Sequence, residues 1–327
     1  MIKSLEVENF KSIRQLKLDC KRINILIGEP NTGKSNILET LGIFSFGAFG
    51  ESIEAYGKLK DFVRFENMDD LFYDQNIEDP IKIKIDEKIL NIRFRNSKFM
   101  GSCREMQKEI FSFDYDYNGS GKAKFSRELS RFRFYRFKVK RDFPKKESDF
   151  LLPPNGENLF TVLLTHKKLR STANQLFSPF ELRLMFKPRE SKIEVVKEYE
   201  DILIGYPYFL ASETLQRIIF YLTAINTSDN SVLIFEEPES HAFPYCTKYL
   251  AEKIALDENE NQYFISTHNH YFLLSILEKS PKEDLGIFIT YFEDYQTKIK
   301  PLIEQDIEEI MDRGHDIFFN IERFLER

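Results

Sequence analysis

The sequence predicts an α/β fold, because three apolar runs each lead directly into a polar segment of distinctive chemistry. The first run, Ile23–Ile27, precedes a loop from Gly28 to Gly33 and a helical pattern from Lys34. The second, 231–237, ends in the consecutive acids Glu236 and Glu237, and the third, 262–268, ends in Ser-Thr-His. Runs that are apolar at most consecutive positions are typical of strands buried on both faces of a sheet.

The loop after the first run has the spacing Gly-x-x-x-x-Gly-Lys-Ser between a strand and a helix, the context that a phosphate-binding P-loop requires. Its glycines let successive N–H groups turn inward at the positive end of a helix. Lys34 is expected to reach the terminal phosphates, and the Ser35 hydroxyl to bind Mg²⁺. A glycine-rich turn without a ligand is the alternative. The predicted loop contacts are Gly28, Glu29, Pro30, Asn31, Thr32, Gly33, Lys34, Ser35 and Asn36.

Composition indicates a soluble globular protein, with 42% hydrophobic and 31% charged residues among 327. This length suffices for one large domain or two lobes. No apolar run approaches the roughly 20 residues that cross a bilayer, so no membrane partner is expected. Acids alternate through residues 1–8, unlike a signal peptide, so we predict a cytoplasmic location.

Positive charge gathers in one stretch, although the net charge is −6. Lys122–Lys146 contains eleven Lys and Arg residues against two acids. Charge alternates with apolar residues through 131–140, which predicts a strand with one cationic face and a break near Tyr135–Arg136. Two interpretations stay open: a surface that contacts DNA or RNA phosphates, and a solvated face that pairs with the acidic segment 61–79.

The remaining pattern predicts strands, then helices, then a mixed tail. The helix from Lys34 is expected to dissolve into the glycine-bearing segment 46–50, and residues 159–190 are expected to be helical. No heptad repeat is sustained long enough for a coiled coil, and no internal repeat is found. Other predicted strands are 2–8, 15–18, 81–85, 90–94, 110–117, 132–139, 192–199 and 285–291, and helical patterns lie at 303–311 and 317–325.

Residues 1–46 resemble the start of a known family. A strand, Asn9-Phe10-Lys11-Ser12-Ile13, a short hairpin and a P-loop ending Gly-Lys-Ser-Asn-Ile-Leu-Glu-Thr-Leu are similar to the start of ABC-type ATPases of the SMC/RecF/OLD-like group, often labelled AAA family ATPases. The resemblance implies a P-loop NTPase of the ABC-ATPase-head type, with a mixed central sheet, a flanking antiparallel β-sheet and a helical lobe. It also implies that Lys11 or Arg14 lies near the nucleotide.

The same resemblance implies one head over residues 1–327, without a coiled coil or a TOPRIM domain. Its parts would be a P-loop and antiparallel β lobe at 1–150, a helical lobe at 151–205, and a third lobe at 206–327.

Roles for the later motifs also follow from the resemblance. The strand ending at Glu236-Glu237 looks like a Walker B motif, in which Glu236 supports Mg²⁺ beside Ser35 and Glu237 activates water. His268 falls on the switch histidine that senses the γ-phosphate. The predicted catalytic residues are thus Lys34, Glu237 and His268. Alternatives are solvated strand-end charge, a structural histidine, and a metal site with His270.

One motif departs from the family pattern. The segment 210–217 has the placement of an ABC signature before a helix, but it contains no glycine. In a head-to-head dimer, Ala211–Thr214 would cap the ATP of the partner copy, and residues 240–244 occupy the D-loop position. No Q-loop glutamine can be located.

Together these features predict an enzyme that binds and hydrolyses ATP with Mg²⁺ and forms an ATP-dependent homodimer. By resemblance, it would be the motor or switch subunit of a DNA-repair, genome-maintenance or anti-phage defence system, acting with a separate effector protein. A nucleotide-gated scaffold with little hydrolysis is the main alternative, and a P-loop kinase is a third.

Overall fold

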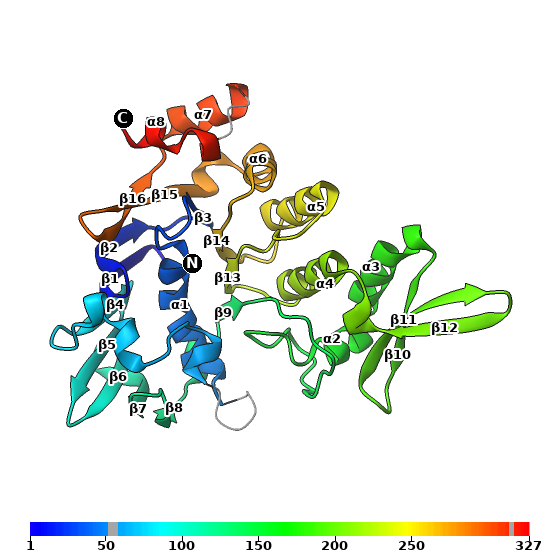
Figure 1. The fold of residues 1–327 in the computed structure, drawn as a ribbon, viewed down its shortest axis with the longest axis horizontal. Helices are drawn as coiled ribbons and strands as arrows, with labels where there is room; N and C mark the ends of the chain where they lie inside the picture. Colours follow the sequence, from blue (N-terminus) through cyan, green and yellow to red (C-terminus); the bar gives the residue numbers. More distant parts are fainter. Residues whose placement is uncertain (52–57, 314–316, 327) are drawn as a thin grey trace.

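The computed structural model describes residues 1–51, 58–313 and 317–326, and a six-stranded sheet lies at its centre (Figure 1). The strand order is β16-β15-β3-β14-β13-β9, in which β16 alone is antiparallel to its neighbour. The bounds are β3 Ile23–Gly28, β9 Phe132–Tyr135, β13 Val232–Glu236, β14 Gln262–Ser266, β15 Leu285–Glu293 and β16 Gln296–Pro301.

The apolar runs form this sheet because alternate side chains enter two separate hydrophobic cores. On β14, Tyr263 and Ile265 point into one core and Phe264 into the other. On β13, Leu233 and Phe235 share the first core, while Val232 and Ile234 share the second. The prediction that these runs are buried strands is confirmed.

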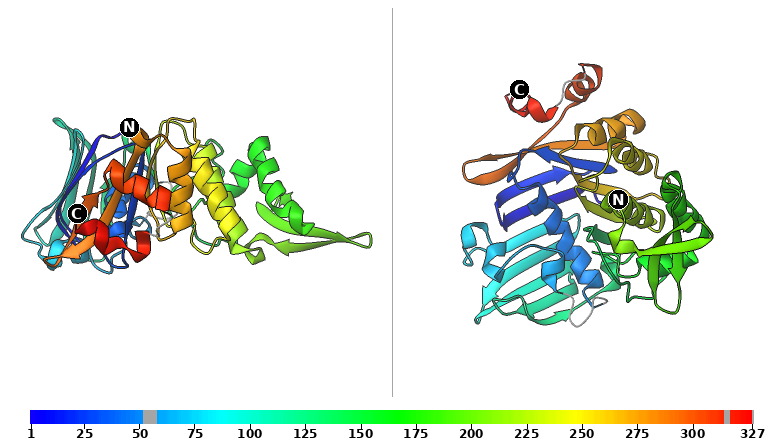
Figure 2. Two further views of the ribbon diagram at one scale, coloured as in Figure 1. Left: turned by 90° about the horizontal axis from the view of Figure 1, so that it is seen from above. Right: turned by 45° about the vertical axis from the view of Figure 1, so that its right-hand side comes forward.

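A seven-stranded antiparallel sheet flanks the central sheet, with the order β2-β1-β4-β5-β6-β7-β8. Together with helix α1 (Lys34–Phe49) it builds the second core (Figure 2, right). Strands β6 and β8 had no separate sequence signal. The bounds are β1 Ser4–Phe10, β2 Ile13–Asp19, β4 Ile81–Ile85, β5 Lys88–Arg95, β6 Lys98–Glu105, β7 Lys108–Tyr115 and β8 Gly121–Lys124.

Helix α1 continues past Gly47, where it was expected to dissolve, and ends at Phe49 with Gly50 as its C-cap. A Cβ on Gly42 would lie 2.9 Å from the Phe62 carbonyl oxygen, and one on Gly47 would lie 2.8 Å from a Leu129 methyl group. These glycines therefore permit close packing of a helix that is buried on nearly all sides.

The helical lobe contains a small sheet that was not predicted in full. Helices α2 (Leu159–Thr165) and α3 (Lys167–Phe177) are followed by β10 (Arg183–Lys187), β11 (Lys192–Tyr199) and β12 (Ile202–Pro207). The prediction of helix over 159–190 is wrong for β10, because pairing with β11 outweighs a weak local preference. This sheet projects away from the centre (Figures 1 and 2).

Three helices cover the other face of the central sheet and share the first core: α4 (Glu213–Asn226), α5 (Pro244–Ala255) and α6 (His270–Lys279). Helices α7 (Glu304–Arg313) and α8 (Ile321–Leu325) close the chain. Among the residues that the structure describes, no helix is long and apolar enough to cross a membrane.

Candidate functional site

Four parallel strands end at the same edge of the central sheet. β3 ends at the P-loop, β14 leads to His268, β13 ends at Glu236, and β9 leads to Arg136. Ligands of open α/β sheets bind outside such carboxyl ends. The topology therefore gathers segments separated by more than 200 positions in the sequence.

The two P-loop glycines cannot be replaced without a steric clash. Gly33 has φ 94°, and a Cβ there would lie 2.1 Å from the Thr297 hydroxyl oxygen. A Cβ on Gly28 would lie 2.3 Å from the Thr290 carbonyl oxygen. Strands β15 and β16 thus press on the loop from one side, and glycine is the residue that fits there.

Lys34 is buried beneath the loop. Its Nζ donates to the carbonyl oxygens of Gly28 at 2.9 Å and Glu29 at 2.7 Å. Burial lowers its pKa to about 8, against the opposing pull of Glu237 and Glu29. The ammonium group is therefore held in place by the loop and lies at the position where phosphates would enter.

Glu237 and His268 face each other across the ends of β13 and β14. His268 Nε2 lies 3.4 Å from Glu237 Oε1, and the Ser240 hydroxyl donates to Glu237 Oε2 at 3.0 Å. Burial and then Lys34 lower the pKa of His268, and Glu237 offsets part of this shift. The imidazole is therefore neutral at pH 7 and offers one donor and one acceptor.

These side chains line a hollow of about 400 Å³ at the P-loop, here called the P-loop hollow. It combines cations, an anion, an imidazole and loop amides, a set that suits a phosphate chain. Its lining is Pro30, Asn31, Gly33, Lys34, Ser35, Asn36, Arg64, Glu237 and His268.

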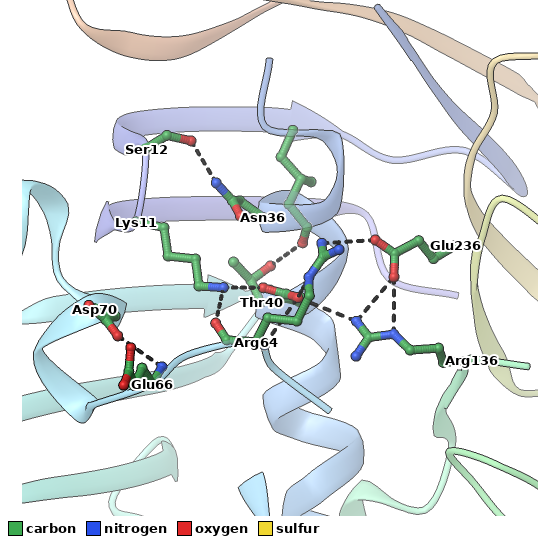
Figure 3. Close-up of polar contacts among 11 residues, drawn as sticks. Lys11, Ser12, Asn36, Thr40, Arg64, Glu66, Asp70, Arg136 and Glu236 are labelled. Atoms are coloured by element: carbon green, nitrogen blue, oxygen red, sulfur yellow. Dashed lines mark hydrogen bonds and ion pairs between the residues drawn. The ribbon is translucent and has the colours of Figure 1, made fainter. Parts of the chain in front are cut away.

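A network of five charged side chains lies beside the hollow (Figure 3). Glu236 Oε1 accepts from Arg64 at 2.9 Å and Oε2 accepts from Arg136 Nε at 3.1 Å. Glu39, fully buried on α1, accepts from Lys11, Arg64 Nε at 2.8 Å and Arg136 at 3.3 Å. The buried carboxylates are therefore each paired, as such groups require.

Burial alone would raise the pKa of Glu236, but Arg136, the nearby Ser35 side chain and Arg64 outweigh burial and lower it. A hydroxyl oxygen beside an ionised carboxylate is the kind of oxygen donor pair that Mg²⁺ prefers, so these residues fit the predicted metal. In the described part of the chain no three His, Cys, Asp or Glu side chains lie together as metal ligands, so the His268–His270 alternative gains no support.

Most predicted site residues line the P-loop hollow, shape its loop or lie beside it, whereas Lys11 and Arg14 lie outside it. Gly28, Glu29 and Thr32 shape the loop, and Thr32 bonds the Glu29 carbonyl at 2.8 Å. Lys11 does not line the hollow, because it is paired with Glu39. Arg14 lines a different surface pocket with Glu8, Asn9, Gln15 and Gln296.

Sequence reasoning missed Arg64 and Arg136. The sequence places Arg136 in the basic stretch and predicts for it a strand with one cationic face. The strand does not continue over 136–139, because β9 ends at Tyr135, where a break was predicted. Arg133 also turns inward and donates to Ser228 Oγ at 2.8 Å, while Lys138 reaches Asp61 at 3.9 Å and Lys140 reaches Glu157 at 3.2 Å.

The signature-like segment borders a second, apolar cavity of about 830 Å³, here called the apolar groove. Helix α4 begins at Glu213, and the Thr214 hydroxyl donates to the His241 carbonyl at 2.8 Å. Ala211, Ser212 and Thr214 all line the groove, beside exposed Leu210 and Phe243. The segment is therefore in contact with the loop that leaves Glu237.

Comparison with known proteins agrees with this architecture. The chain has the fold of the SMC ATPase head. A family model described as an AAA ATPase domain matches residues 1–201. The chain belongs to this family, and it accordingly carries an ATP-binding AAA ATPase domain.

Two solved structures share the fold at low sequence identity. One is an SMC head with an extended coiled coil bound to the C-terminal domain of ScpA, derived from Pyrococcus furiosus (TM-score 0.57, 12% identity, 96% of this chain and 99% of that chain). The other is an SMC head bound to the C-winged helix domain of ScpA (TM-score 0.55, 14% identity, 93% and 99%).

A curated relative matches a shorter stretch. The uncharacterized protein MJECL10 of Methanocaldococcus jannaschii is 31% identical over 104 residues, which is 30% of this chain. The match spans about half of that relative, 48% of its length.

Proposed function

We propose that this chain hydrolyses ATP, with Lys34 on the terminal phosphates, Glu237 positioning the attacking water and His268 facing the γ-phosphate. The observation that carries the proposal is the convergence of these three side chains on one hollow from β3, β13 and β14. Neutral His268 can donate a hydrogen bond to a phosphate oxygen, and Glu237 can accept a proton from water.

The proposed cofactors are ATP and Mg²⁺, with Ser35 and Glu236 as the protein ligands of the metal. When bound, Mg²⁺ would neutralise charge that develops on the phosphates. Gly28, Gly33 and the loop amides would surround the phosphate chain. Lys11 would act on the site indirectly, because it is paired with Glu39, which also accepts from Arg64 at the hollow.

The test is Glu237→Gln. Removal of a general base is expected to lower phosphate release by about 10²–10⁴-fold. Binding of ATP should persist, since the amide keeps the shape of the side chain. Glu87→Gln, in the exposed turn between β4 and β5, is the control and should match the parent. Unchanged phosphate release by Glu237→Gln would refute the assigned role.

We further propose an ATP-dependent head-to-head homodimer in which Ala211–Thr214 of one copy faces the P-loop hollow of the other. Support comes from the contact between Thr214 and the loop that leaves Glu237. A separate effector is part of the proposal, by analogy with the ScpA-bound SMC heads. The setting is proposed to be cytoplasmic, in DNA repair, genome maintenance or anti-phage defence.

We do not propose a nucleic-acid contact for the basic stretch. The inward arginines of the basic stretch are already bonded to protein groups, which argues against a cationic strand face.

A nucleotide-gated scaffold with little hydrolysis is the second candidate. The observation that favours it is Glu236, whose two oxygens are both held by arginines. Steady-state phosphate release separates the two functions, because a scaffold would bind ATP and release almost no phosphate.

A further inference from the structure

The backbone that carries His268 is fixed by its neighbour Thr267. Thr267 is fully buried just after β14, and its backbone N–H donates to the Leu26 carbonyl at 3.1 Å. Its hydroxyl accepts from the Asn269 backbone N–H at 3.0 Å. Thr267 is thus bonded both to the P-loop strand β3 and to the residue that caps α6.

The same hydroxyl also reaches the loop that leaves Glu237. It donates to Glu239 Oε1 at 2.5 Å, and Glu239 is only 4% exposed. In the part of the chain that the structure describes, Glu239 Oε2 is buried without a hydrogen-bond partner. The Glu239 carboxyl is therefore tied to the segment after β14 by one hydroxyl, which acts as donor and acceptor at once.

The turn from Glu237 to Ala242 has a strained backbone. Glu237 has φ 43°, in the left-handed region that residues other than glycine rarely adopt. The Ser240 N–H donates to the Glu237 carbonyl at 3.1 Å, and the Ala242 N–H donates to the Glu239 carbonyl at 3.0 Å. A strained conformation of this kind persists only where the surrounding contacts impose it. The buried side chain of Glu239, two residues after Glu237, supplies such a contact.

The two side chains that meet in the P-loop hollow are not enclosed themselves. His268 is 37% exposed and Glu237 is 41% exposed, with 3.4 Å between Nε2 and Oε1. Their mutual position therefore depends on the backbone segments that carry them, which Thr267 and Glu239 join from beneath. Burial of a carboxyl has a cost that an apolar side chain would avoid, so stability alone does not account for Glu239.

We propose that Thr267 and Glu239 are positioning residues: their buried hydroxyl–carboxyl bond joins the segment that carries His268 to the turn that carries Glu237. The bond keeps the imidazole beside the carboxylate, and neither positioning residue lines the hollow. The inference rests on the proposed function, in which His268 faces the γ-phosphate and Glu237 positions the attacking water.

Thr267→Val is the first test, because valine keeps the shape of threonine and removes its hydroxyl. The kcat of ATP hydrolysis should fall by about tenfold to a hundredfold, because a small misplacement of reacting groups is costly. KM should stay within about twofold of the parent, because the nucleotide contacts are unchanged. Thr267→Ser keeps the hydroxyl and should recover most of the lost kcat.

Thr223→Val is the matched control. Thr223 is buried on α4, and its hydroxyl donates to the Ile219 carbonyl at 2.7 Å. This variant loses a buried hydroxyl away from the hollow and should match the parent in kcat and KM.

Glu239 provides a second pair of variants, which carries the test if thermal melting shows that Thr267→Val is unfolded. Glu239→Gln keeps an acceptor oxygen for the Thr267 hydroxyl and should turn over ATP like the parent. Glu239→Met has a similar length but lacks that oxygen, so it should lose kcat as expected for Thr267→Val.

The ring signals of His268 give a measurement that needs no turnover. Isotope-labelled histidine makes the five histidines visible by NMR, and His268→Gln identifies the signal of interest. Burial and then Lys34 keep the pKa of His268 below its ordinary value. In Thr267→Val the ring should leave this environment, so its pKa should rise toward the ordinary value of histidine. Thr267→Ser and Thr223→Val should titrate like the parent.

A fall in kcat that Thr267→Ser reverses, together with a raised pKa of His268 in Thr267→Val, supports the inference. Equal loss in Thr267→Val and Thr267→Ser, or an unchanged pKa of His268, overturns it. If the parent hydrolyses no ATP, the proposed function fails, and the titration of His268 alone decides whether the two residues position it.

Discussion

The P-loop hollow and the apolar groove differ in charge, size and exposure, although one loop joins them. The hollow, about 400 Å³, is lined by two cations, a carboxylate and a histidine. The groove, about 830 Å³, has a single charged lining residue, Lys197, and exposed Phe243 and Tyr245 at its rim. The first can hold a charged ligand by itself, whereas large exposed apolar surfaces are typical of contacts with other proteins.

The residues between them, 237–243, carry the connection. Glu237 lies in the hollow and Phe243 in the groove. Between them, Glu239 is buried and accepts from the Thr267 hydroxyl at 2.5 Å, next to His268. The comparison therefore predicts that changes in the hollow act on nucleotide binding, changes in the groove act on association, and changes at Glu239 act on the fold that joins them.

The largest effect is expected for Lys34→Ala in the hollow. Loss of the buried ammonium should weaken ATP binding by about a hundredfold, because its charge-assisted bonds to phosphate disappear. Fluorescence titration with labelled ATP measures this. Lys108→Ala, at the exposed start of β7, should bind like the parent. Near-parental affinity in Lys34→Ala would mean that the hollow is not the nucleotide site.

An intermediate effect is expected for Glu239→Gln. Burial raises the pKa of Glu239 from 4.5 to about 7. A carboxyl whose pKa is raised by folding stabilises the folded state most at pH values below its pKa in the unfolded chain. This stabilisation is lost as the pH rises from that value through the pKa of the carboxyl in the folded protein. Between pH 4.5 and pH 8 the parent should thus lose about 2–3 kcal/mol of unfolding free energy relative to Glu239→Gln, whose amide does not titrate.

Urea unfolding at several pH values measures this difference. Glu198→Gln, on the exposed face of β11, should follow the pH profile of the parent. Parallel profiles for the parent and Glu239→Gln would show that Glu239 ionises normally in the folded protein.

The smallest effect is expected for Phe243→Ser at the rim of the groove. ATP affinity of the single chain should stay within about twofold of the parent, because Phe243 is outside the hollow. ATP-dependent dimerisation should weaken by about tenfold, as for an aromatic anchor of an interface. Analytical ultracentrifugation of the Glu237→Gln protein with ATP measures it, with Phe292→Ser on β15 as the control. If Phe243→Ser and Phe292→Ser weaken dimerisation equally, the groove has no specific part in dimerisation.

Sequence predicted the hollow better than its surroundings, for a physical reason. Gly28–Ser35, Glu236-Glu237 and His268 each follow an apolar run whose burial is encoded locally, so strand ends and their polar residues could be placed together. Arg64 and Arg136 gave no such signal, since their partners Glu39 and Glu236 are brought to them only by the folded sheet. The apolar groove was also missed from the sequence. Strands β10 and β12 form by pairing with β11, and their own sequences carry no strand pattern that would indicate this pairing.

The position of β3 in its sheet has a consequence for dissecting the chain. The family match ends at residue 201, but β3 lies between β14 and β15, which both come later. A fragment cut at 201 would leave the P-loop strand with two bare edges and without the residues that press on Gly28 and Gly33. The break would fall in the tight turn between β11 and β12, a site where a nick is easily tolerated, so the two pieces would need to be expressed together to rebuild the site.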